Sequence, residues 1–96
     1  MAEWEIKEHP DFFKDLDNLG ANELQIFYKK KNKIKENPLR QKHLSGGANC
    51  YREPITDSIR LVYLAEAKTI WLLTLRPHDK SFQDFKKRFY TLRIKY

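Results

Sequence analysis

Three arginines and one histidine have the residue types and spacing needed to act on a phosphate ester. Arg52, Arg60 and Arg76 occur in three successive strand-like runs, and His78 follows the third arginine. The planar guanidinium of arginine matches the shape of a phosphate, and a histidine can exchange a proton near neutral pH. The pattern predicts a phosphodiester site on three adjacent strands, with His78 as its acid or base.

Arg60 is informative because it interrupts an apolar strand. Side chains alternate along a strand, so Ile59, Leu61 and Tyr63 are predicted to face the core and Arg60 the opposite side. A charge in a central strand is costly unless it meets a partner. That partner is either a ligand or an acid such as Glu53.

The same alternation places Thr74, Arg76 and His78 on one face of the last strand. The alternative for His78 is a solvated histidine at a strand end, without a catalytic role. Glu53 and Lys80 are the candidates for a second proton-transfer group. The sequence has no carboxylate cluster or histidine pair with metal-ligand spacing, and no glycine-rich phosphate loop. We therefore expect no metal ion and no cofactor.

Further candidates for RNA contacts are basic or aromatic residues that flank the strands. They are Arg40, Lys42, His43, Lys80, Phe82 and Phe85. The first three belong to a basic loop predicted at 38–49. The two phenylalanines could stack on bases, but they also lie on a helical stripe, so core packing is the alternative.

The charge of the chain is divided unevenly along its 96 residues. Residues 1–20 hold six acids and two bases, a net charge of −4. Because the whole chain has a net charge of +6, residues 21–96 carry +10. A basic body attracts polyanions, although a solvated surface that maintains solubility is the alternative.

The chain has a single cysteine, Cys50, which excludes an internal disulfide and suits a reducing cytosol. We expect one cytoplasmic domain over 1–96, with neither a signal peptide nor a membrane span.

The predicted fold is α+β, in the order β-α-α-β-β-β-α. A small, mostly antiparallel sheet is packed by an N-terminal two-helix hairpin and followed by a C-terminal helix. The expected strands are 4–7, 50–55, 59–65 and 69–77, and Pro54 predicts that 50–55 is an edge strand. Asn22 and Gln25 predict the capping box of the second helix, and Ser81 predicts the start of the last one.

Apolar stripes indicate which face of each helix is buried. The three stripes are Phe12, Phe13, Leu16 and Leu19; Leu24, Phe27, Tyr28 and Ile34; and Phe82, Phe85, Phe89, Leu92 and Tyr96.

With these motifs the chain resembles the RelE/ParE superfamily of toxins from type II toxin–antitoxin systems. The resemblance is carried by His43-Leu44-Ser45-Gly46-Gly47, by Cys50-Tyr51-Arg52 and by Ile59-Arg60-Leu61-Val62-Tyr63. It implies a metal-independent endoribonuclease that cleaves mRNA, usually on the ribosome, and a cognate antitoxin that neutralises it.

The resemblance also implies roles for individual residues. Arg60 matches the phosphate-binding arginine of the family, and Arg52 matches a basic residue on the preceding strand. His78 with Phe82 is similar to the ending of YafQ-like toxins, in which the histidine does acid–base work. Two features depart from the RelE type: Pro54 replaces a catalytic lysine, and no tyrosine stands at the usual terminal position. A ParE-like gyrase inhibitor and a non-catalytic RNA-binding module therefore remain the alternatives.

Overall fold

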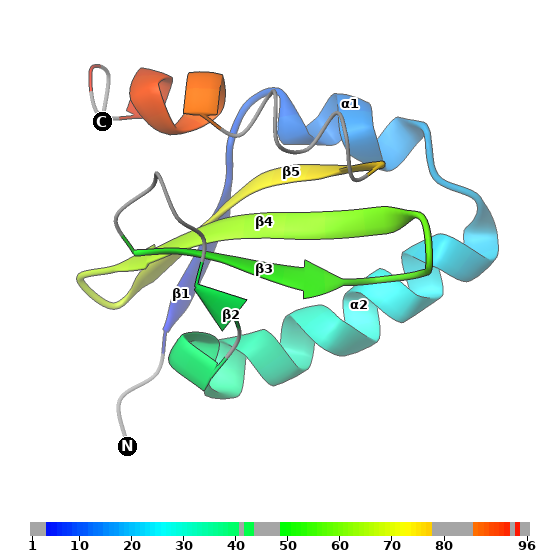
Figure 1. Cartoon of the computed structure of the whole chain (residues 1–96), viewed down its shortest axis with the longest axis horizontal. Helices are drawn as coiled ribbons and strands as arrows, with labels where there is room; N and C mark the ends of the chain where they lie inside the picture. The colour runs from blue at the N-terminus through cyan, green and yellow to red at the C-terminus, as the bar shows by residue number, and fades with distance from the viewer. Residues whose placement is uncertain (1–3, 41, 44–48, 78–85, 93, 95–96) are drawn as a thin grey trace.

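The computed structural model describes residues 4–40, 42–43, 49–77, 86–92 and 94 (Figure 1). The elements are β1 (Glu5–Glu8), α1 (Phe12–Asp17), α2 (Ala21–Glu36), the 3-10 turn η1 (Pro38–Arg40), β2 (Lys42–His43), β3 (Cys50–Pro54), β4 (Ile59–Glu66) and β5 (Thr69–Pro77). Residues 86–92 are helical. The predicted α+β order is confirmed, with one correction: the expected loop at 38–49 contains η1 and the extra strand β2. The predicted start of the last helix at Ser81 lies outside the described residues.

The strands form one five-stranded sheet in the order β1-β5-β4-β3-β2. β1 runs parallel to β5, and the other neighbours are antiparallel. Ala67 and Lys68 connect β4 to β5 with φ angles of 53° and 64°, as a two-residue hairpin turn requires. The edge position predicted for β3 needs correction, because β2 pairs with Tyr51 and Arg52. Pro54 lies beyond the residues that pair with β2, so its missing N–H breaks no hydrogen bond between β2 and β3.

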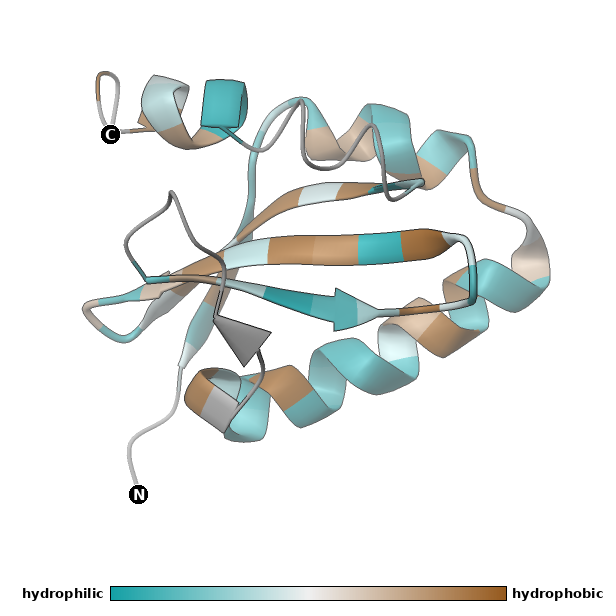
Figure 2. Cartoon of the chain, in the orientation of Figure 1, coloured by the Kyte–Doolittle hydropathy of each residue, from teal (hydrophilic) through white to brown (hydrophobic). Residues whose placement is uncertain are grey.

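Helices α1 and α2 cover one face of the sheet. Their residues Phe12, Phe27 and Ile34 join a core with Ile59, Leu61, Tyr63 and other sheet residues. The prediction that the odd-numbered residues of β4 face the core is thus confirmed. Figure 2 shows apolar residues along β4 and β5, and mostly hydrophilic ones on the outside of α2.

Two aromatic residues predicted for the core are exposed instead. Phe13 is 55% exposed and Tyr28 is 49% exposed. Helix α1 has only six residues, so a narrow strip of it reaches the sheet, and Asp15 takes a buried position there beside Phe12. Tyr28 packs its ring against Phe27 at a centroid distance of 5.1 Å.

The start of α2 also differs from the prediction. The helix begins at Ala21, and the backbone N–H of Gly20 donates to Glu23 Oε1 at 2.9 Å. Asn22 therefore lies inside the first turn and does not cap it. The carboxylate of Glu23 takes the role predicted for Gln25, because it comes three residues after the true N-cap.

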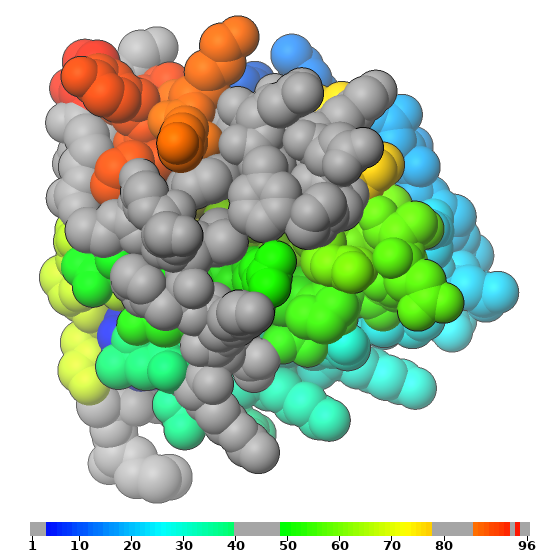
Figure 3. Space-filling model, viewed as in Figure 1, coloured from blue at the N-terminus to red at the C-terminus, as the bar shows by residue number. Residues whose placement is uncertain are grey.

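The C-terminal helical residues cover part of the opposite face of the sheet. Leu92 is buried there with Cys50, Val62, Leu64 and Leu73, and Phe89 packs against the same cluster. The helical stripe is thus confirmed for Phe89 and Leu92. In the space-filling view, atoms of β3 and β4 are visible at the end of the sheet near the β3–β4 turn (Figure 3).

Candidate nucleic-acid interface

The structure brings Arg52, Arg60 and Arg76 to one face of the sheet. Arg60 pairs directly with Arg76 across β4 and β5, and Arg52 pairs with Val62 across β3 and β4. Directly paired residues share a face and lie about 4.5–5.5 Å apart at Cα. Val62 lies on the face opposite the core that α1 and α2 cover, so the three arginines start from that opposite face. The side chain of Arg76 reaches the sheet edge, where its Nε lies 3.9 Å from Asp15 Oδ1 of α1. Thr74 pairs with Val62, so its predicted place beside Arg76 is confirmed.

A bulge in β5 helps to place Arg76. Val62 pairs with Thr74 and Tyr63 with Leu72, so Leu73 has no partner on β4. The extra residue resets the alternation of β5. As a result Leu72 and Leu75 both join the helix-covered core, and Arg76 emerges opposite Arg60.

Two like charges directly opposite one another weaken a pair of strands. The turn between β3 and β4 offsets part of this cost for Arg60. Its Nη1 donates to the backbone carbonyls of Thr56 at 2.7 Å and Asp57 at 3.3 Å. The guanidinium is therefore held by the turn, and Arg60 remains only partly buried.

The partner suggested for Arg60 by sequence, Glu53, lies on the other face of the sheet. Glu53 pairs with Leu61, which is in the helix-covered core. Its Oε1 lies 3.2 Å from Lys30 Nζ on α2. Glu53 as a proton-transfer group beside the arginines is therefore a wrong prediction. Pro54, in contrast, pairs directly with Arg60.

The other predicted residues are only partly described. Lys42 pairs with Arg52 and His43 with Tyr51 in the register of β2 and β3, and Arg40 ends η1. The remaining candidates His78, Lys80, Phe82 and Phe85 lie outside the described residues. Among the described parts of the chain, no group of three or more His, Cys, Asp and Glu residues is placed to hold a metal ion.

Tyr63 has a strongly shifted pKa, and it lies on the helix-covered face. Burial, followed by the nearby Glu53 and Tyr51, raises the pKa of its phenol far above the usual range. Its hydroxyl donates to the carbonyl of Pro38 at 2.6 Å. Tyr63 is therefore a neutral hydrogen-bond donor that fixes η1 against the sheet.

A buried ion pair was not predicted from sequence. Arg88, in the C-terminal helical segment, places Nη1 at 2.6 Å from Asp15 Oδ2. The two residues are 7% and 2% exposed. The same Nη1 donates to the carbonyl of Leu73 at 2.7 Å, and the N–H of Leu75 donates to Asp15 at 2.9 Å.

This pair completes the edge of β5. β1 pairs with residues 69–72 only, so the edge groups of Leu73 and Leu75 lie beyond its reach. Asp15 and Arg88 supply the hydrogen bonds that a longer β1 would have supplied. The sequence offers only a weak indication of this ion pair, because Asp15 and Arg88 each stand next to an apolar residue of their helix.

Several solved structures share the fold of this chain, although no protein-family model and no curated protein matches it. A mutant of Escherichia coli toxin RelE in the free state has a TM-score of 0.76 at 21% identity, covering 92% of this chain and 98% of the other.

Two toxin–antitoxin complexes are similar as well. The archaeal RelE–RelB complex from Pyrococcus horikoshii matches with a TM-score of 0.64 at 23% identity, covering 80% of this chain and 96% of the other. The YoeB–YefM complex from Staphylococcus aureus matches with a TM-score of 0.65 at 19% identity, covering 78% and 97%. The chain thus has the fold of toxins from toxin–antitoxin systems. It shares this fold with RelE and with YoeB. None of the described helices has the length and apolar character to cross a membrane.

Proposed function

We propose that the chain is the toxin of a type II toxin–antitoxin system and cleaves mRNA, on the ribosome, without a metal ion. The observation that carries this proposal is the direct pairing of Arg60 with Arg76, with Arg52 on the same face. The planar guanidinium of arginine matches the shape of a phosphate, so three arginines on one face suit an RNA-binding role.

The proposed chemistry uses the nucleophile that RNA already contains. The 2′-hydroxyl attacks the adjacent phosphorus, the 2′-O–P bond forms and the P–O5′ bond breaks. The 2′-hydroxyl loses its proton, and the departing 5′-oxygen gains one. Arg60, with Arg52 and Arg76, stabilises the negative charge that grows on the phosphate oxygens. The products are a 2′,3′-cyclic phosphate and a 5′-hydroxyl.

His78 is proposed as one proton-transfer group, since it follows β5 by one residue. His78→Ala should slow cleavage about 10²–10⁴-fold, the usual contribution of a general acid or base. The measurement is the single-turnover rate on a labelled RNA, with a thermal melt as a check on folding. A variant that cleaves at the wild-type rate would make His78 a bystander and shift the role to Lys80 or to a group on the ribosome.

A ParE-like gyrase inhibitor is the second candidate function. It is favoured by Pro54, which lies directly opposite Arg60, where the RelE type has a catalytic lysine. A supercoiling assay with purified gyrase separates the two: inhibition of gyrase without new RNA ends supports the ParE-like function. RNA that is bound but never cut, with gyrase unaffected, indicates a non-catalytic binding module.

The partner proposed for this chain is an acidic antitoxin. A RelBE toxin–antitoxin complex is among its structural neighbours, and residues 21–96 carry a net charge of +10 that an acidic segment would match. A disordered acidic segment that orders on the arginine face would block RNA by occupying the same charges. Size-exclusion chromatography after co-expression with the product of the adjacent gene is the test; a neighbour that neither binds nor suppresses cleavage rules it out.

A further inference from the structure

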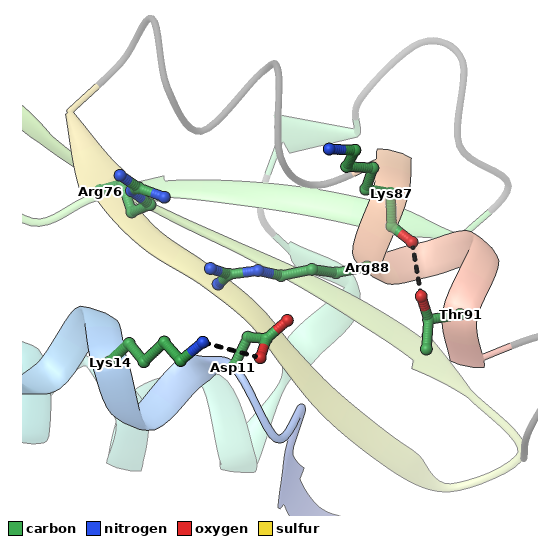
Figure 4. A pocket seen from close by; sticks show the side chains of 6 residues that line it. All are labelled: Asp11, Lys14, Arg76, Lys87, Arg88 and Thr91. Carbon is green, nitrogen blue, oxygen red and sulfur yellow. Dashed lines mark hydrogen bonds and ion pairs between the residues drawn. The ribbon is translucent and has the colours of Figure 1, made fainter.

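A cavity of about 350 Å³ opens at the end of the sheet, where the start of β4 and the end of β5 meet α1 and the start of α2. Arg76 lines this cavity and also pairs directly with Arg60 on the arginine face. Figure 4 shows Arg76 projecting from the last part of β5. Ile59 and Pro77, the next pair along the same two strands, line the cavity too. The cavity therefore begins one residue pair beyond the paired arginines.

One part of the lining is apolar and firmly packed. It consists of the side chains of Leu19, Ile59, Leu75 and Pro77. Ile59 and Leu75 belong to the core under the helices and are almost fully buried. Aliphatic side chains of this kind pack against the flat faces of a base that has left its stack. The apolar part of the lining thus suits a planar ring.

Glu23 brings a carboxylate to the cavity in a fixed position. Its Oε1 accepts the backbone N–H of Gly20 at 2.9 Å, the bond that begins α2. An ionised carboxylate has about four acceptor positions on its two oxygens. The bond to Gly20 therefore leaves it able to accept two parallel N–H groups from a ligand. Glu23 is only partly buried, so a ligand can reach it.

Asp15 also lines the cavity, but its carboxylate is used by the fold. Its Oδ2 accepts from Arg88 Nη1 at 2.6 Å and from the N–H of Leu75 at 2.9 Å, and the residue is 2% exposed. Figure 4 shows Arg88 reaching from the C-terminal helical segment towards α1. Asp15 is therefore part of the wall, and Glu23 is the carboxylate that a ligand meets.

The polar groups that are present match the Watson–Crick edge of guanine, which carries two adjacent N–H donors beside a carbonyl oxygen. A carboxylate binds such a pair of donors through two parallel hydrogen bonds. Adenine, cytosine and uracil offer only one donor, next to an acceptor. The amide of Asn18, which also lines the cavity, donates one hydrogen to the carbonyl of Lys14 at 3.1 Å. Its second hydrogen is able to donate to the guanine carbonyl.

We propose that this cavity binds a guanine base of the RNA, next to the phosphate held at Arg60 and Arg76, with Glu23 as the residue that selects the base. The inference rests on the proposed function and deepens it, because it names the nucleotide that the chain recognises. The charges agree with this placement: the anionic phosphate stays with the arginines, and the neutral base meets the carboxylate. Single-stranded RNA suits such recognition, since its bases are free to turn outwards.

The test measures how tightly the full chain binds short 2′-O-methyl RNAs, which cannot be cleaved by the proposed route. The RNAs consist of uridine with one central base, which is guanine, inosine, adenine or cytosine, and binding is followed by fluorescence anisotropy. Inosine lacks the amino group of guanine and so gives Glu23 one N–H fewer. Wild-type protein should bind the guanine RNA about tenfold more tightly than the inosine RNA, the usual effect of one hydrogen bond to a charged group.

Two variants with the same change of charge identify Glu23 as the source of this preference. Glu23→Gln keeps an acceptor for Gly20 but turns an amide N–H group towards the donors of guanine. It should bind the guanine RNA about tenfold more weakly than the wild type, and no better than the inosine RNA. Glu36→Gln, at an exposed position at the other end of α2, should keep the preference for guanine. A thermal melt of each variant shows that folded proteins are compared.

Equal binding of the guanine and inosine RNAs by the wild type would overturn the guanine proposal, and so would a Glu23→Gln variant that keeps the wild-type preference. Tighter binding of the adenine or the cytosine RNA would overturn it as well. In each of these cases, salt-dependent binding of all four RNAs would leave the proposed function standing. A wild type that binds none of them, even at low salt, would overturn both.

Discussion

Arg60→Ala should abolish the growth arrest that expression of this chain causes in a bacterial host, and it should slow RNA cleavage about 10²–10³-fold. That is the usual loss when one preorganised donor to a developing oxyanion is removed. Arg60 is the arginine whose guanidinium the β3–β4 turn already holds, through the carbonyls of Thr56 and Asp57. Removing it also ends the repulsion with Arg76, so the loss of activity should occur in a folded protein.

Two further variants make the result specific. Arg60→Lys keeps the charge but loses the planar fork, and we expect it to recover only part of the rate. Lys33→Ala removes an exposed charge on α2, far from the arginine face in sequence and on the other side of the sheet, and should arrest growth as the wild type does. Undiminished arrest by Arg60→Ala, with the variant present at the wild-type level, contradicts the proposed role.

The second large effect is on stability. Arg88→Met should lower the free energy of unfolding by about 3–5 kcal/mol, because it leaves the carboxylate of Asp15 buried without its partner. The substitution also removes the donor to the carbonyl of Leu73, which faces the open edge of β5. Urea unfolding followed by circular dichroism gives the change as a shift of the midpoint at constant slope.

A double-mutant cycle identifies the source of that destabilisation. Asp15→Asn/Arg88→Met replaces the buried charge and keeps an acceptor for the N–H of Leu75, so it should be more stable than Arg88→Met alone. Lys14→Met, at an exposed position, should change the stability by no more than about 0.5 kcal/mol. If Arg88→Met costs no more than that control, the ion pair is not what fixes the C-terminal helical segment.

The sheet face of each arginine could be predicted from sequence because alternation is a local property. Ile59, Leu61 and Tyr63 alternate with Arg60 over a few residues, and the period of two assigns every side chain once one of them is placed. The direct pairing of Arg60 with Arg76 could not be predicted, because it depends on the length of the hairpin turn and on the bulge at Leu73. Both features depend on the register in which β4 pairs with β5.

The helices show where periodicity misleads. Phe13 and Tyr28 fit an apolar stripe but are exposed, since a short helix buries fewer residues than its stripe contains. The capping preference of Asn22 predicts a start of α2 that is too late along the chain, because Gly20 with Glu23 forms the actual start. The ion pair of Asp15 and Arg88 joins residues 73 positions apart, a separation over which no local pattern applies.

If the RNA's own 2′-hydroxyl is the nucleophile, as proposed, the chemical ends of the fragments must show it. Purified wild-type protein is incubated with mRNA that carries either a normal or a 2′-deoxy nucleotide at the mapped cleavage position. One set of reactions contains EDTA and no ribosomes. The other contains programmed ribosomes in their usual magnesium buffer. We predict fragments that end in a 2′,3′-cyclic phosphate and begin with a 5′-hydroxyl, and no cut at the 2′-deoxy position. Cleavage that persists at the 2′-deoxy nucleotide, or no new ends in either setting, would contradict the proposed 2′-hydroxyl mechanism.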